Sequence, residues 1–229
     1  PGIASIANLP VYIEGRNGNS QAKYLQEETL ERAFSNLQGN GIKVGRFRAD
    51  SASYQKKVIE LVEGHSRSFY IRAKRCAKMD ELIGAVAKAS WEKIRLDTQE
   101  MEVTGIPNYC PFGGNKPYRL VVSRIKRKDS QTDLFSGEAY TYRDILTNDT
   151  QSTNREVVAF YNARGQSERL FDVMNNDFGW AKMPCSFLAE NTAFMLMTAL
   201  YANFYHYLIG EYSKKLSWLK PNFRLKKFI

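Results

Sequence analysis

The sequence predicts an α/β fold with a mixed sheet and flanking helices, interrupted by an antiparallel β-rich insertion. In residues 1–75, short strand-like runs alternate with amphipathic helical runs, a pattern that implies a sheet covered by helices. In residues 76–139, strand-like runs are separated by Pro and Gly, which indicates antiparallel hairpins. Residues 140–229 return to mainly helical periodicity. We therefore expect a core in two parts, 1–75 and 140–229, with the insertion 76–139 between them.

The individual elements follow from the spacing of apolar residues and from capping and turn residues. In the first part we expect strands at 11–14, 43–49 and 69–74, and helices at 20–37 and after Ser51 or Ser53. In the insertion we expect a short helix at 79–89 and strands at 91–96, 100–106 and 118–128. In the last part we expect a strand at 140–146 and helices from about Thr153 and over 186–208.

The apolar run 187–209 is long enough to be considered as a membrane span. Polar residues such as Glu190, Asn203 and His206 interrupt it, so the sequence favours a buried core helix. Its Met and aromatic residues are expected to be core residues, and the residues so assigned are Phe194, Met195, Met197, Tyr201 and Phe204.

Composition indicates a globular chain with an anionic partner. The 229 residues are 43% hydrophobic and carry a formal net charge of +9. A basic balance of this size favours nucleic acid, although a merely basic protein remains the alternative. Three cysteines without a Cys-x-x-Cys pair, together with only two histidines, argue against a zinc site and fit a cytosolic protein with reduced thiols.

Three polar residues share one face of the helix expected after Thr153. Tyr161, Arg164 and Glu168 are spaced i, i+3 and i+7. A phenol, a cation and a carboxylate on one stripe could hold a divalent metal and a phosphate together, and Asp50, at the end of an expected strand, could be a second metal ligand. Taken alone, the stripe is better explained as a solvated face with an Arg–Glu pair, because such pairs are common on helices.

With its context, this stripe resembles the DDE transposases of bacterial insertion sequences, in the group that has a β-strand insertion before the final glutamate. Four segments carry the resemblance: the turn 15–19, the segment 48–51, the strand 69–74 and the Tyr-x2-Arg-x3-Glu signature at 161–168. Together they span nearly all of the chain.

The resemblance implies a ribonuclease H-like fold and metal-dependent cleavage and joining of double-stranded DNA at transposon ends. It makes Asp50 and Glu168 catalytic ligands of two Mg²⁺ (or Mn²⁺) ions. It makes Tyr161 and Arg164 contacts to DNA phosphates. Further candidate DNA contacts are Arg16, Asn19, Lys74, Arg124, Lys126, Arg127 and Lys128. For the basic run 124–128, a solvated hairpin edge is the alternative.

The resemblance also implies a possible homodimer on paired DNA ends, in the bacterial cytoplasm and nucleoid, with no membrane partner. Two departures qualify it. The family lysine seven positions after the glutamate is Asn175 here, and no Asp precedes Asp50. We therefore expect the first catalytic aspartate to lie upstream of residue 1 and this chain to be inactive by itself. A non-catalytic DNA-binding remnant or a basic scaffold of transposase origin is the alternative.

Overall fold

The computed structural model describes residues 2–16, 21, 23–126 and 140–227. Contacts divide the chain into two compact units. The central unit is Gln26–Arg164, and the terminal unit combines Pro1–Leu25 with Gly165–Ile229.

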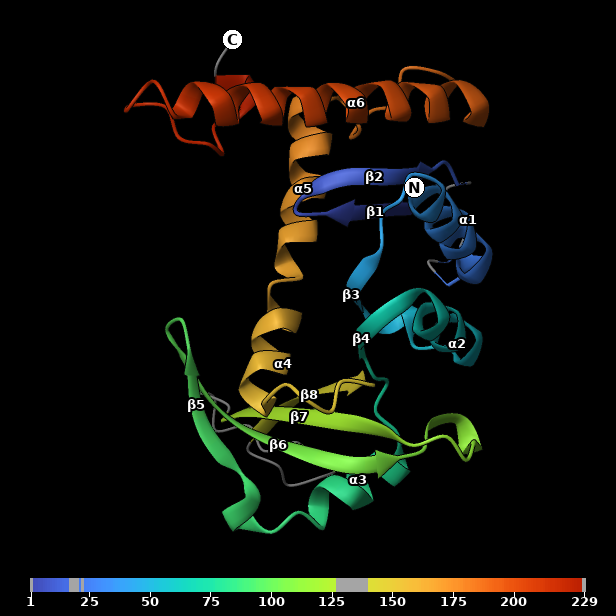
Figure 1. Cartoon of the computed structure of the whole chain (residues 1–229), viewed down its shortest axis with the longest axis vertical. Helices are drawn as coiled ribbons and strands as arrows, with labels where there is room; N and C mark the ends of the chain where they lie inside the picture. The colour runs from blue at the N-terminus through green and yellow to red at the C-terminus, as the bar shows by residue number, and fades with distance from the viewer. Residues whose placement is uncertain (1, 17–20, 22, 127–139, 228–229) are drawn as a thin grey trace. The chain divides into compact units, whose positions relative to one another are not determined.

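The central unit is built on a six-stranded mixed sheet with the strand order β3-β4-β8-β7-β6-β5 (Figure 1). The strands are β3 (Val44–Ala49), β4 (Ser66–Arg72), β5 (Glu92–Leu96), β6 (Gln99–Tyr109), β7 (Tyr118–Lys126) and β8 (Tyr140–Thr147). β3 and β4 are parallel, and the other neighbours are antiparallel. The strands β5, β6 and β7, which lie in the expected insertion, therefore belong to the same sheet as β3 and β4. β8 lies between the two groups and pairs with both β4 and β7.

The α-helices described in this unit are α1 (Gln26–Gly39), α2 (Lys56–His65), α3 (Ala77–Gly84) and α4 (Asn154–Asn162). α2 forms the crossover that the parallel pair β3–β4 requires. The helices and the mixed sheet confirm the predicted fold class and are consistent with a ribonuclease H-like transposase fold.

Both faces of the sheet are buried. On β4, Phe69 and Ile71 belong to a core cluster with residues of α1, α2 and α3, whereas Tyr70 belongs to a second cluster with residues of α4. Successive strand residues point to opposite faces, so this alternation places apolar side chains on both. β7 repeats the pattern, since Leu120 and Val122 join the first cluster and Val121 the second. Layers of helices therefore enclose the central strands.

The terminal unit joins the two ends of the chain. It contains the antiparallel hairpin β1 (Gly2–Ile6) and β2 (Leu9–Glu14), and the helices α5 (Gly165–Asp177) and α6 (Leu188–Ser213). The hairpin turn uses Ala7 and Asn8, both with positive φ, as a two-residue turn of the primed type requires. α6 packs on β2 and α5 around a cluster that includes Ile13, Met174 and Trp180.

The structure corrects two sequence predictions. β1 was not expected. The helix 186–208 is present as α6, but it is not a buried core helix. Met195 is 3% exposed, while Met197, Tyr201 and Phe204 are 56%, 62% and 57% exposed. The reason is that α6 carries apolar residues on all sides, whereas only one side packs against the rest of the terminal unit. No helix in the described ranges is long and apolar enough to cross a membrane.

Candidate functional site

Asp50 lies where β3 ends, as the sequence predicts. Its carboxylate is exposed and caps the short 3-10 turn Ser51–Ser53, accepting a hydrogen bond of 2.9 Å from the backbone N–H of Ala52. This cap holds the carboxylate at the edge of the sheet, at the carboxyl end of a parallel strand.

Two arginines precede Asp50 on the same face of β3. Arg46, Arg48 and Asp50 are two residues apart, so strand alternation puts them on one side. The guanidinium carbons of Arg46 and Arg48 lie 4.3 and 5.0 Å from the centre of the Phe160 ring in α4. Nη1 of Arg48 also donates a hydrogen bond of 2.8 Å to the carbonyl of Phe160. These contacts attach the strand to the last turn of α4.

Further arginine side chains lie near Asp50 and the end of α4. Burial lowers the pKa of Arg48, and the charges of Arg164 and Arg46 lower it further. Burial raises the pKa of Tyr161; Arg164 and Arg72 oppose this shift, and Asp50 adds to it. These couplings place Asp50 and Tyr161 in one electrostatic neighbourhood with four guanidinium groups. We call the four residues the arginine cluster: Arg46, Arg48, Arg72 and Arg164.

Like charges brought together disfavour one another, so the cluster is suited to an anion that offsets them. Guanidinium groups also match the geometry of phosphate oxygens and can bind them in pairs. The arrangement is therefore chemically fitted to a phosphodiester beside Asp50.

α4 is held in place by a capping box at its first turn. Thr153 Oγ1 accepts a hydrogen bond of 3.2 Å from the backbone N–H of Glu156, and Glu156 Oε2 accepts one of 2.7 Å from the backbone N–H of Thr153. The expected start of this helix is thus confirmed.

Arg119 of β7 ties the loop before α4 to the sheet. Its guanidinium donates hydrogen bonds to the carbonyls of Asp149 (3.1 Å) and Ser152 (2.6 Å), and to Oδ1 of Asn154 (2.7 Å). From β4, the Tyr70 hydroxyl donates a bond of 2.5 Å to Asp149 Oδ2. Burial, followed by this bond, raises the pKa of Tyr70 to about 12. The position of α4, and with it that of Phe160 and Tyr161, is therefore fixed by polar contacts that are buried or partly buried.

The Tyr161–Arg164–Glu168 stripe does not lie on one continuous helix. α4 ends at Asn162 and α5 begins at Gly165, with Ala163 and Arg164 in a turn between them. The expectation of a single helix is wrong, because periodicity cannot show a two-residue break and Gly165 weakens helical continuity. Tyr161 and Arg164 belong to the central unit, and Glu168 is an exposed residue of α5 in the terminal unit.

Tyr161 differs from expectation in its exposure as well. Its side chain is 5% exposed and belongs to the core cluster beneath α4, with Val157 and Val158. The ring therefore packs in the core. Arg164, in the turn, is partly exposed.

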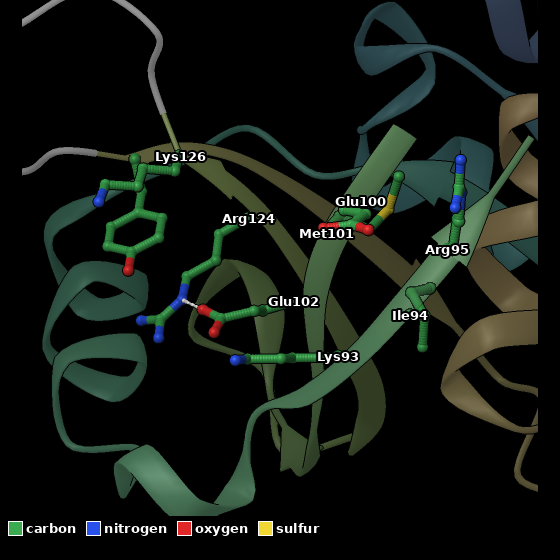
Figure 2. A pocket seen from close by; sticks show the side chains of 9 residues that line it. Lys93, Ile94, Arg95, Glu100, Met101, Glu102, Arg124 and Lys126 are labelled. Atoms are coloured by element: carbon green, nitrogen blue, oxygen red, sulfur yellow. Dashed lines mark hydrogen bonds and ion pairs between the residues drawn. The ribbon is translucent and has the colours of Figure 1, made fainter. Parts of the chain in front are cut away.

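Arg124, a predicted DNA contact, is engaged within the sheet. Its Nε donates a hydrogen bond of 2.7 Å to Glu102, and its guanidinium carbon lies 3.8 Å from the Trp91 ring and 4.4 Å from the Tyr140 ring. Burial opposes the charged form, but the bonds to Glu102 and Tyr142 outweigh it, and the pKa of Arg124 is raised. Figure 2 shows this ion pair on the wall of an open groove of about 530 Å³.

Cations and carboxylates alternate along this groove. Lys93 of β5 is the register partner of Glu102, and Glu102 is the partner of Arg124. The pair Arg95–Glu100 repeats the alternation two residues further on (Figure 2). The surface is therefore of mixed charge, although Lys93, Arg95 and Lys126 are exposed.

The remaining predicted DNA contacts are spread over both units. Lys74 is exposed just after β4, and Arg16 lies 4.0 Å from Glu14 in the terminal unit. Three others lie outside the described residues: Asn19, Arg127 and Lys128.

A divalent metal is implied by the resemblance, and the donor chemistry fits it. Asp50 and Glu168 are exposed carboxylates, and Mg²⁺ prefers hard oxygen ligands. Among the residues that the structure describes, no group of three or more His, Cys, Asp or Glu side chains could hold a metal. The roles of Asp50 and Glu168 therefore remain predictions.

Sequence reasoning missed Arg46, Arg48 and Phe160. The available signal was the period-two spacing of Arg46, Arg48 and Asp50 on an expected strand, which indicates one shared face. The contribution of Phe160 was not visible, because it depends on how α4 packs on the sheet.

Comparison with known proteins identifies the family to which the chain belongs. None of the curated proteins compared with the chain gives a significant match. The model of the transposase DDE domain matches residues 7–204, a range that includes Asp50, the arginine cluster and Glu168. Because this match covers most of the 229 residues, the chain belongs to the transposase DDE domain family.

Proposed function

We propose that this chain is the catalytic domain of a bacterial insertion-sequence transposase, which cleaves and transfers DNA strands with divalent metal ions. The family supports DNA processing in general. At the level of residues, the observation that carries the proposal is the arginine cluster beside Asp50.

In this proposal Asp50 and Glu168 hold the metal. A divalent ion held there would supply Lewis-acid chemistry: activation of an attacking oxygen and stabilisation of charge on the leaving oxygen of a phosphodiester. The cap to Ala52 orients the Asp50 carboxylate before any ligand arrives. Preorganisation of this kind reduces the cost of assembling the site.

The arginine cluster positions the DNA backbone. Arg48 is held by Phe160, so it loses little further freedom on binding a phosphate. Arg46 is exposed and able to reach solvent. Lys74, Lys126, Arg127 and Lys128 would extend the contact along double-stranded DNA at transposon ends, supported by the net charge of +9.

The phosphate contact is tested with a matched pair of variants. Arg46→Ala removes a cluster charge, whereas Arg67→Ala removes an exposed arginine which, by alternation along β4, faces the other side of the sheet. We expect Arg46→Ala to weaken binding of a double-stranded oligonucleotide by about 10-fold, and Arg67→Ala by less than about 3-fold, in fluorescence polarisation at fixed salt. Equal losses would contradict a specific role for the cluster.

The metal ligands are tested independently of DNA. Mn²⁺ binding, followed by electron paramagnetic resonance, should be lost in Asp50→Asn and in Glu168→Gln, and kept in Glu81→Gln, which changes an exposed carboxylate of α3. DNA binding through the arginine cluster without any Mn²⁺ site at Asp50 would instead support the alternative, a non-catalytic DNA-binding remnant of a transposase.

A further inference from the structure

A pocket of about 400 Å³ lies within the terminal unit. Its lining comes from four segments: the turn of the hairpin β1–β2, α5, the second half of α6, and the tail that follows α6. Figure 1 shows this tail, which folds back along the last part of α6. Every lining residue belongs to this one unit, so the walls of the pocket do not involve the central unit.

The tail is attached to both helices. Arg224 donates a hydrogen bond of 2.6 Å to Asp172 Oδ2 of α5 and another of 2.6 Å to Asp177 Oδ1. The side chain of Asp177 is only 1% exposed, so water competes little for this contact. From α6, the Tyr205 hydroxyl donates a bond of 3.1 Å to the carbonyl of Phe223. These contacts hold the tail in place as one wall of the pocket.

The inside of the pocket is mainly apolar. Its most buried lining residues include Leu170, Ala202 and Ile209, which are 8%, 9% and 2% exposed. Phe178 and Phe223 also line it and are half-buried. Aromatic side chains pack favourably against other rings, edge to face or offset. A pocket of this size with this lining therefore fits the body of a small aromatic molecule.

The charged residues of the lining differ in their pairing. Its two carboxylates, Asp172 and Asp177, are both engaged by Arg224. Arg169 of α5 also lines the pocket and is exposed, and it forms no ion pair within the part of the chain that the structure describes. A guanidinium group can bind a carboxylate through two parallel hydrogen bonds. The lining thus offers a cation to an anionic head group, while its own carboxylates are already occupied.

We propose that this pocket binds a small aromatic carboxylate, whose ring occupies the apolar interior and whose carboxylate pairs with Arg169. A neutral ligand would leave Arg169 without a counter-charge, and a cationic ligand would meet carboxylates that Arg224 already holds. The ligand would contact α5, α6 and the tail together. Neither Asp50 nor Glu168 lines the pocket, so this binding stands apart from the proposed DNA chemistry.

The test uses two probes with the same ring system, 2-naphthoate and its uncharged amide, 2-naphthamide. Isothermal titration calorimetry of the 229-residue chain without DNA should show one site for 2-naphthoate and binding of the amide that is weaker by about 10-fold. Arg169→Gln should weaken 2-naphthoate by about 10-fold and leave the amide unchanged. Lys182→Gln is the charge-matched control, because Lys182 is an exposed cation of the same unit that does not line the pocket. Val173→Trp, which fills the pocket from α5, should abolish binding of both probes.

Several outcomes would overturn the proposal. They are no saturable binding of 2-naphthoate, binding that Val173→Trp leaves intact, equal affinity for the two probes, and equal weakening by Arg169→Gln and Lys182→Gln. The last result would mean that the carboxylate responds only to the overall charge of the chain. Circular dichroism checks that the variants fold. Should Val173→Trp unfold, Leu225→Trp fills the same pocket from the tail and gives the same readout.

Discussion

At the scale of single residues, Asp144 is a carboxyl group that destabilises the fold at neutral pH. It lies on β8 and is 4% exposed, and its Oδ1 has no hydrogen-bond partner among the residues that the structure describes. Burial raises its pKa to about 6; Asp80 adds to the shift, while Arg75 and Arg72 oppose it. A charged and incompletely paired carboxylate in this position costs free energy.

We predict that Asp144→Asn stabilises the chain at pH 7.5 and removes a pH dependence. Between pH 3.8 and about 6 the folded state keeps a proton that the unfolded state has released, so the free energy of unfolding falls as pH rises through this window. The loss amounts to about 3 kcal/mol. Differential scanning calorimetry should show a gain of about 5 °C or more at pH 7.5 and a smaller gain at pH 4.5. Glu92→Gln, an exposed control on β5, should show neither effect, and equal gains at both pH values would contradict the assignment.

At the scale of elements, the start of α4 depends on Arg119. Three hydrogen bonds from one guanidinium hold the loop before the helix and its first residue, Asn154. We predict that Arg119→Met lowers the free energy of unfolding by about 2 kcal/mol, because the bonds are charge-assisted and the acceptors lose their partner. Urea denaturation measures the change. Arg143→Met, an exposed arginine of β8, is the control, and a similar loss in both variants would show that Arg119 has no special role.

The elements also show where sequence reasoning succeeds. The start of α4 was predictable because the Thr153–Glu156 capping box is a local signal. The strands β3 to β8 were predictable from alternation and from Pro and Gly turns. The break before Gly165 and the hairpin partner β1 were missed, since each depends on packing that periodicity does not encode. The exposure of α6 was missed for a related reason: a helix that is apolar on all sides gives no sign of which side is covered.

At the scale of the whole molecule, the net charge favoured an anionic partner without identifying it, and the boundaries of the two compact units could not be read from the sequence. The charge of +9 indicated a polyanion, in agreement with the family. The terminal unit joins residues from both ends of the chain, which only the folded contacts reveal. The division into a core of residues 1–75 and 140–229 with an insertion at 76–139 remains a prediction, alongside the two units that contacts define.

The same charge leads to a prediction about salt. If the arginine cluster neutralises DNA phosphates, each contact releases counterions, and log K falls with log [salt] by about 0.9 per phosphate. Four arginines at the site therefore predict a slope on the order of −4 for the wild-type chain. Arg46→Ala should make the slope about one unit shallower, whereas Arg67→Ala should leave it nearly unchanged, because its side chain faces the opposite side of the sheet. Polarisation titrations from 50 to 300 mM KCl, with one duplex and all three proteins, measure the slopes. Identical slopes for the two variants would mean that the attraction comes from the overall charge of the chain, and the cluster beside Asp50 would lose its assigned part in holding DNA.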